Sequence, residues 1–299
     1  MDFLNYAFMQ RALVSALLVG ITAPAVGIYL VQRRQALMGD GIGHVAMTGV
    51  GLGFLLSTSP VWMATAVAVL GSVLMELIRW YGKTRGDIAL AMLFYGGMAG
   101  GVMLINLAGG SNANLSSYLF GSLSTVSQPE MTAICVLAAF VLLVTLGLRR
   151  QLFAVSQDEE FARVTGLPVR ALNLLTAVTA AVTVTVAMRV VGLLLVSALM
   201  VVPVAAAQQL SRSFTATFAI AVAIGVTVTV SGTITSYYQY VPPGATIVLL
   251  TIGAFLVLTA LATPLARRRA RAAAAARPAG DPAECSIPAT RGATDEVGV

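Results

Sequence analysis

Residues 171–210 read ALNLLTAVTAAVTVTVAMRVVGLLLVSALMVVPVAAAQQL, and Arg189 is the only charged residue among them. A helix needs about 20 mostly apolar residues to cross a bilayer. The stretch is therefore long enough for two membrane spans that meet at Met188-Arg189, as a helical hairpin, or for one long kinked helix. Either arrangement places these side chains in lipid or against other spans, so the sequence predicts a membrane protein.

The rest of the chain has the same character. Of its 299 residues, 58% are apolar and 10% are charged, and its mean hydropathy is +0.88. Soluble domains average roughly 25% charged residues, so this composition excludes a water-soluble globule. We predict an all-α polytopic membrane protein with eight or nine transmembrane helices. The apolar runs lie near 12–31, 36–57, 61–78, 88–108, 131–148, 171–187, 190–208, 214–235 and 245–264.

Basic residues determine the orientation that we expect. If the N-terminus lies outside, sixteen of the eighteen lysines and arginines fall on the inner side, and only Arg11 and Arg189 remain outside. Cytoplasmic loops carry such an excess, so we expect a multi-pass protein with a cytoplasmic C-terminus. The net charge of +6 then follows from topology and does not indicate nucleic-acid binding.

The composition changes near the end of the chain. We predict a transmembrane domain over residues 1–265 and a cytoplasmic tail over residues 266–299, where arginine, alanine and proline predominate. Such a tail cannot bury a core and is expected to be disordered. Its arginine cluster is expected to contact anionic membrane lipids.

Reactive side chains are scarce. The chain has one histidine, His44, one lysine, Lys83, and two cysteines. This inventory excludes a disulfide framework, a cysteine-rich zinc site and a histidine-rich catalytic centre. A nucleotide-binding P-loop needs G-x-x-x-x-G-K-[ST], and its first glycine would fall at Leu77. We therefore expect no ATPase site in this chain, and any ATP must be bound by another polypeptide.

Ionisable groups inside spans are costly and are therefore candidates for function. Asp40 and His44 stand four residues apart in Met38-Gly39-Asp40-Gly41-Ile42-Gly43-His44, a spacing that places both on one face of a helix. A carboxylate and an imidazole can share a divalent cation such as zinc or manganese. They can also pair with each other or cap the helix, and the spacing alone leaves these alternatives open. Arg189 is expected to anchor the outer interface or to contact an external partner.

Glycines recur at intervals of four on two of the expected spans. Small residues at this spacing allow helix backbones to approach closely inside a membrane. We therefore expect tight helix contacts at the pairs Gly39/Gly43, Gly49/Gly53, Gly96/Gly100 and Gly97/Gly101.

Residues 156–168, SQDEEFARVTGLP, are too well organised for a simple linker. Ser156 and Glu159 match a capping box, and Gly166 can end a helix. We predict a short cytoplasmic helix of about two turns with Phe161 and Val164 on one face. Because isolated helices of this length are marginal in water, it is expected to dock on the bundle or on a soluble partner.

Several blocks of the sequence resemble bacterial zinc/manganese ABC-importer permeases. The resemblance runs from about residue 10 to 265, in order, and the tail from 266 lies outside it. It rests on Arg33-Arg34 with Leu37-Met38-Gly39-Asp40 and His44, Tyr118-Leu119-Phe120-Gly121-Ser122-Leu123, Asp158-Glu159-Glu160-Phe161-Ala162 with Gly166, Val191-Gly192 through Ala198-Leu199 to Pro203, and Pro242-Pro243-Gly244. One departure is visible, because the family's serine before the histidine is Gly43 here.

The resemblance implies a homodimeric permease of a bacterial cytoplasmic membrane with two kinds of partner, cytoplasmic ATP-binding subunits and an extracytoplasmic metal-binding protein. The importer would move Zn²⁺ or Mn²⁺ inward, and this chain would be no enzyme and would bind no cofactor of its own. Asp40 and His44 would be transient metal contacts on the pathway. The helix that couples to the ATPase would consist of Asp158, Glu159, Glu160, Phe161 and Ala162, followed by Gly166.

Two other classes of protein fit the sequence less well. An ion-coupled secondary transporter of a small cation would need carboxylates deep in its spans, and after Asp40 the spans supply almost none. An intramembrane enzyme would need a nucleophile placed beside the single histidine.

Overall fold

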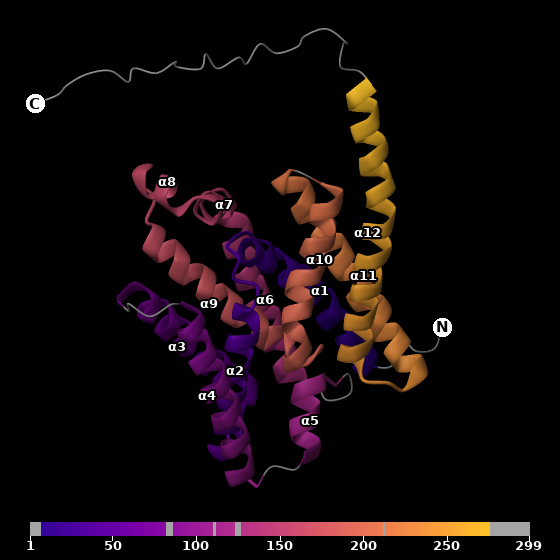
Figure 1. Cartoon of the computed structure of the whole chain (residues 1–299). Coiled ribbons are helices and arrows are strands. Elements are labelled where there is room, and N and C mark those ends of the chain that lie inside the picture. The colour runs from indigo at the N-terminus through magenta and orange to yellow at the C-terminus, as the bar shows by residue number, and fades with distance from the viewer. Residues whose placement is uncertain (1–6, 82–85, 110–111, 123–126, 212, 276–299) are drawn as a thin grey trace, which may run out of the picture. The chain divides into compact units, whose positions relative to one another are not determined.

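The computed structural model describes residues 7–81, 86–109, 112–122, 127–211 and 213–275, and over these residues the chain forms helices and no strands (Figure 1). The all-α prediction is confirmed. In chain order the helices are α1 (Ala7–Gln32), α2 (Met38–Leu55), α3 (Pro60–Tyr81), α4 (Gly86–Leu107), α5 (Asn112–Phe120), α6 (Gln128–Gly147), α7 (Arg149–Gln157), α8 (Glu159–Val164), α9 (Val169–Ala187), the short 3-10 helix η2 (Leu193–Leu195), α10 (Val196–Leu210), α11 (Phe214–Gln239) and α12 (Pro243–Ala275).

Eight of the helices in this described part are long and apolar enough to cross a membrane. They are α1, α3, α4, α6, α9, α10 together with η2, α11 and α12. The ninth predicted span is α2, whose glycines and two ionisable residues lower its hydropathy. Most of α2 is buried, and it packs against α3, α4 and α9. Protein encloses this helix, so it does not need a fully apolar surface. The prediction of eight or nine spans is therefore confirmed.

Residues 171–210 form two helices and not one kinked helix. The break begins after Ala187, where α9 ends, and α10 starts at Val196. Gly192 has a φ of +88°, and a Cβ added there would meet Leu119 O at 2.4 Å. Gly121 has a φ of +78°, and a Cβ added there would lie 2.4 Å from Val190 O. Only glycine suits both positions, so the turn after α9 packs backbone to backbone against the end of α5.

Side chains at helix ends explain several of the boundaries. Ser127 caps α6 in a capping box with Glu130, whose carboxylate accepts a hydrogen bond of 2.9 Å from Ser127 N. Ser213 caps α11 by accepting a hydrogen bond from Ala216 N. At its other end α11 stops at Tyr240, which adopts a left-handed φ of 52° just before Pro242-Pro243. The two serines satisfy backbone N–H donors that the helix starts leave open.

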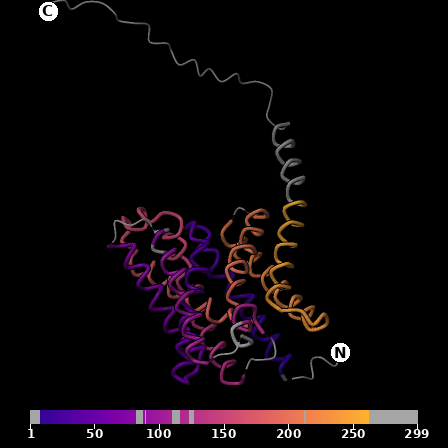
Figure 2. Tube along the Cα trace, turned by 60° about the horizontal axis from the view of Figure 1, so that its bottom comes forward, coloured from indigo at the N-terminus to yellow at the C-terminus, as the bar shows by residue number. Residues whose placement is uncertain are grey.

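The core of the bundle is built around α1. This helix packs against α6, α9, α10 and α11, and the turned view in Figure 2 shows its indigo trace among the other helices. Tyr29, one of its fully buried side chains, donates a hydrogen bond of 3.1 Å to Thr145 O. On the outside, large apolar residues such as Leu70 and Leu143 are exposed. A bilayer, unlike water, covers such a surface without cost.

The predicted tight glycine contacts are confirmed at Gly49, Gly53, Gly97 and Gly101. They are not confirmed at Gly39 and Gly43, where an added Cβ would meet its neighbours at ordinary distances of 3.5 Å or more, or at Gly96. A Cβ added at Gly97 would lie 2.6 Å from the backbone carbon of His44, and one added at Gly101 would lie 2.8 Å from the Met47 side chain. A Cβ added at Gly49 would lie 2.6 Å from the Cα atom of Ala64 on α3. Gly96 has nothing within 4 Å, because it points away from α2. The α4 glycines therefore set the distance between α4 and the helix that carries Asp40 and His44.

Residues 261–299 form a unit separate from residues 1–260. Its described part, up to Ala275, is helical and belongs to α12. The backbone of 266–275, which we expected to be disordered, is thus helix, and the remainder of the predicted tail, 276–299, lies outside the described residues.

We predict that Gly97→Ala destabilises the protein, because the new Cβ meets the backbone of His44 at 2.6 Å and cannot be relieved by a rotamer change. Overpacking of this kind costs typically about 1–3 kcal/mol. Thermal unfolding in detergent should therefore show a Tm several degrees below that of the wild type.

Gly96→Ala is the matched control, one residue away on the same helix and with open space around it. Its Tm should equal or exceed the wild-type value, because alanine is the better helix former. Equal Tm values for the two variants would contradict the close α2–α4 contact.

Candidate functional site

Asp40 lies in the first turn of α2 and contacts a second helix. Its Oδ1 accepts a hydrogen bond of 2.6 Å from Ser197 Oγ in the first turn of α10. No side chain caps the start of α2, and none of the ion pairs found in the described part of the chain joins Asp40 to His44. The capping and pairing alternatives are therefore not realised. The carboxylate retains lone pairs that can accept a cation or a water.

His44 lies one turn further along α2 and is almost fully buried, with 5% of its surface exposed. Its ring packs edge-on against Phe94 of α4, with 4.2 Å between the ring centroids. Its Nδ1 is buried and has no hydrogen-bond partner in the structure. A buried polar atom without a partner costs free energy, so such an atom is a candidate ligand for a cation that passes the site.

Ser197 is the site residue that sequence reasoning missed. A lone serine in an apolar run gives no charge signal, and its distance of 157 residues from Asp40 hides the contact. The turn after α9 and the short helix η2 bring it to α2, because α10 begins only at Val196. Its position inside the block from Val191 to Pro203, which contributed to the family resemblance, was the only available indication.

The donors at Asp40, His44 and Ser197 are too few to form a closed metal site. Within the described residues, no cluster of three or more His, Cys, Asp or Glu side chains lies together. The local donors are one carboxylate, one imidazole and one hydroxyl, and a closed structural site would use four strong ligands. Such a set is suited to brief contact with an ion and not to permanent binding.

The predicted capping box of the short cytoplasmic helix is wrong. Ser156 lies in the last turn of α7, and its hydroxyl donates a hydrogen bond of 2.9 Å to Gln32 Oε1 at the end of α1. Asp158 is the cap of α8, because its Oδ1 accepts a hydrogen bond of 2.9 Å from Phe161 N. The run 149–157 is already helical, so the next helix starts two residues later than we predicted.

The outer face of α8 is apolar and exposed. Phe161 and Val164 have 63% and 86% of their surface exposed, whereas Ala162 between them is buried against the bundle. Glu160 is exposed beside them. Gly166, with a φ of +81°, ends the segment as predicted. The helix is thus anchored on one side and offers two apolar side chains and a carboxylate on the other, which is the pattern of a docking surface.

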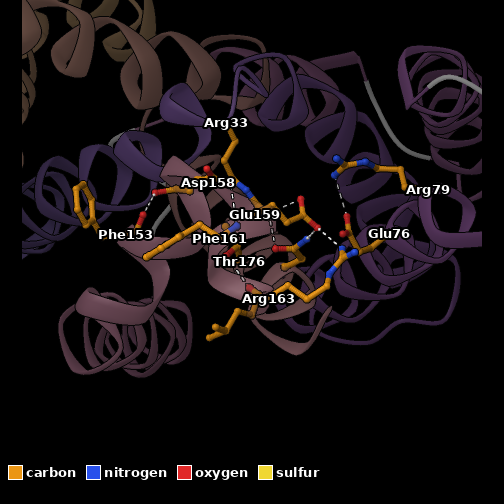
Figure 3. Close-up of polar contacts among 12 residues, drawn as sticks. Arg33, Glu76, Arg79, Phe153, Asp158, Glu159, Phe161, Arg163 and Thr176 are labelled. Carbon is orange, nitrogen blue, oxygen red and sulfur yellow. Dashed lines mark hydrogen bonds and ion pairs between the residues drawn. The ribbon is translucent and has the colours of Figure 1, made fainter. Parts of the chain in front are cut away.

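Glu159 turns away from this face and connects α8 to the bundle. Its Oε2 lies 3.9 Å from the Arg33 guanidinium, and its Oε1 lies 3.7 Å from that of Arg163. Figure 3 shows the carboxylate between the two arginines. Burial lowers the pKa of Arg33, and the charge of Glu159 opposes this shift. The ion pair therefore offsets part of the cost of burying the guanidinium.

Arg189 neither anchors the outer interface nor is positioned for an external partner. It is buried, its Nη2 lies 2.9 Å from Glu130 Oε1, and its guanidinium lies over the Tyr118 ring at 4.8 Å. The prediction was wrong because the turn after α9 folds inward against α5 and α6. The sequence alone did not show that Glu130 would meet this arginine.

Comparison with known proteins gives a consistent result. The ABC 3 transport family matches residues 5–262. A probable metal transport system membrane protein of Treponema pallidum is 34% identical over 89% of this chain and 99% of its own length. The manganese import system permease protein ScaB of Streptococcus gordonii is 30% identical over 85% of this chain and 91% of its own. The solved structure of PsaBC from Streptococcus pneumoniae in complex with Fab superposes with a TM-score of 0.79 at 31% identity, covering 86% of this chain and 93% of that one.

We predict that Asp158→Ala loosens α8, because it removes the acceptor for the Phe161 amide. Loss of an N-cap costs typically about 1 kcal/mol, so hydrogen exchange of amides 159–165 should accelerate roughly fivefold. Ser156→Ala is the control, since its hydroxyl bonds to Gln32 and not to α8. If only the Ser156 variant exchanged faster, Ser156 and not Asp158 would be the cap of α8, as the sequence analysis predicted.

Proposed function

This chain belongs to the ABC 3 transport family, and from that premise we propose that it is the membrane permease subunit of an ATP-driven importer for a divalent metal ion. The observation that carries the proposal is the donor set inside the bundle. Asp40 and His44 lie one turn apart on an enclosed helix, the carboxylate meets Ser197, and the imidazole Nδ1 has no partner. Family relatives named for metal transport support the same conclusion.

In this proposal the ion crosses the membrane beside α2. The Asp40 carboxylate, the Ser197 hydroxyl and the His44 imidazole replace part of the water shell that the ion loses. Three donors hold an ion weakly enough for release, as passage requires. If two copies of the chain assemble, as the resemblance implies, the importer contains two such donor sets.

Manganese is the cargo that we propose to test first, with zinc as the second. Two of the three donors are oxygens, which suit Mn²⁺, whereas zinc sites favour thiolate and imidazole. The described cysteine, Cys135, is exposed on α6 and does not contribute to the site. ScaB is named for manganese, although a chelated iron transport system membrane protein of Yersinia pestis is also 31% identical.

ATP hydrolysis is assigned to a separate subunit. The chain contains no P-loop sequence, and α8 presents Phe161 and Val164 to solvent on a capped and anchored helix. We infer that these side chains enter a groove of the cytoplasmic ATP-binding subunit, with Glu159, Ala162 and Gly166 holding the helix in place. An extracytoplasmic binding protein would deliver the metal to the opposite side of a bacterial cytoplasmic membrane, and the C-terminus would lie in the cytoplasm.

An ion-coupled secondary transporter is the weaker alternative. It would need a further carboxylate free to bind and release the coupling ion. Among the described helices, Glu76 is paired with Arg79 at 3.0 Å and Glu130 with Arg189 at 2.9 Å. Both carboxylates are thus neutralised by neighbours, and Asp40 is already part of the donor set.

We predict that Asp40→Ala and His44→Ala each reduce metal uptake by the assembled importer at limiting metal about tenfold or more, which corresponds to about 1.4 kcal/mol of lost binding. Ser197→Ala should have a smaller effect, a rise in KM of roughly three- to tenfold, because only one hydrogen bond to the carboxylate is lost. Initial rates of manganese and zinc uptake measure both effects.

Ser231→Ala is the matched control for Ser197, since Ser231 is exposed on α11 and bonds only to its own helix. It should transport like the wild type, and all variants should assemble with the ATPase. Normal uptake by both the Asp40 and the His44 variants would show that these residues are structural.

We further predict that Phe161→Glu detaches or uncouples the ATPase, because it places a charge in the apolar docking face. Copurification of the ATPase with the tagged permease, and metal-stimulated ATP hydrolysis, should both fall. Tyr240→Glu is the control, since Tyr240 is an aromatic residue at the end of α11 that is even more exposed than Phe161. The assignment of α8 fails if the Phe161 variant retains full ATPase binding and stimulation.

A further inference from the structure

Arg33 lies at a point where three segments of the chain meet. It directly follows α1, and only 9% of its side chain is exposed. Its Nη2 donates a hydrogen bond to Asn173 Oδ1 of α9 and lies 3.9 Å from Glu159 Oε2 of α8. Asn173 Nδ2 in turn donates a hydrogen bond of 3.2 Å to Glu159 Oε1. The three side chains thus form a closed set of polar contacts.

This burial is more than membrane topology requires. An arginine that only orients a membrane protein can remain in water, where its charge is solvated. Arg33 is instead removed from water and depends on two protein partners, and breaking a buried pair is costly. Arg163, the other neighbour of Glu159, has an exposed side chain, and such surface pairs contribute little. Arg33 is therefore the stronger link between Glu159 and the bundle.

The chain turns sharply between Arg33 and the candidate metal site. Arg34 adopts a φ of +57°, and Gln35 N donates a hydrogen bond of 2.9 Å back to Leu30 O. Helix α2 begins at Met38, and Asp40 is in its first turn. Because this hydrogen bond closes the turn, we expect a displacement of Arg33 to reach the start of α2.

A second contact joins the same two parts of the structure. Gln32, the last residue of α1, accepts a hydrogen bond of 2.9 Å from Ser156 at the end of α7. The helices α7 and α8 are therefore connected to the α1–α2 turn by two neighbouring side chains. A rigid element with two discrete positions is the physical basis for coupling between distant sites.

We propose that Arg33 is the positioning residue that transmits the movement of α8 to the helix carrying Asp40 and His44. Glu159 and Asn173 hold its guanidinium, and the turn at Arg34 passes the displacement to α2. The inference rests on the proposed function, because it requires an ATPase that moves α8.

The test measures the amount of metal taken up for each ATP hydrolysed by the complete importer in liposomes. Arg33→Gln removes the charge and the pair with Glu159. The complex should still assemble and hydrolyse ATP, whereas the uptake per ATP should fall about fivefold or more, as expected for a typical coupling between sites. Glu159→Gln should produce a similar loss, and the double variant should be no worse than the more impaired single variant.

Arg150→Gln is the matched control, an exposed arginine on α7, and it should leave the ratio unchanged. If Arg33→Gln fails to assemble, Arg33→Lys decides the question, because it keeps the charge but lacks the planar guanidinium that can hold both partners. A reduced ratio in the lysine variant supports the proposal.

A wild-type ratio in the assembled Arg33→Gln complex overturns the proposal. Where that variant does not assemble, a wild-type ratio in the Arg33→Lys complex overturns it, as does failure of both variants to assemble, which would make Arg33 purely structural. The proposed function is tested separately by the wild-type complex. If that complex moves no metal with ATP, the function itself is wrong, whereas normal wild-type transport with fully coupled variants refutes only the role of Arg33.

Discussion

Helix α2 carries an aspartate and a histidine through a bundle whose outer surface is apolar, and lipid solvates neither group. The structure meets this constraint by enclosing α2 between α3, α4 and α9. Gly97 allows α4 to reach the backbone of His44, and Ser197 of α10 reaches Asp40. The same enclosure makes these polar groups tolerable, and the proposed transport places the path of the ion beside them, so the proposal depends on the packing of α2.

At the end of the bundle that carries α8, protein groups also compensate a buried charge. Arg33 is charged and nearly buried, and Glu159 and Asn173 compensate it. Because Glu159 belongs to α8, the segment that presents Phe161 for docking is connected to the α1–α2 turn. In the proposed mechanism, energy supplied by a partner subunit reaches Asp40 and His44 through this connection. A chain with one histidine, one lysine and no P-loop can act in active transport in this way.

Sequence reasoning predicted features that depend on local pattern. The spans, the break near Met188-Arg189, the placement of Asp40 and His44 on one helix and the shared exposed face of Phe161 and Val164 all follow from hydropathy, spacing or helix-end chemistry. It failed where distant segments meet. The contact of Ser197 with Asp40 and the pair of Arg189 with Glu130 join residues far apart in the chain. The misplaced cap at Ser156 is a local error, because α7 already occupied that residue.

We expect this chain to move metal only when a partner subunit hydrolyses ATP. The most direct test is manganese uptake into liposomes that contain the purified chain with or without its ATP-binding subunit. We expect accumulation only when both proteins and hydrolysable ATP are present. Accumulation by the chain alone, driven by a proton or sodium gradient, would contradict the account.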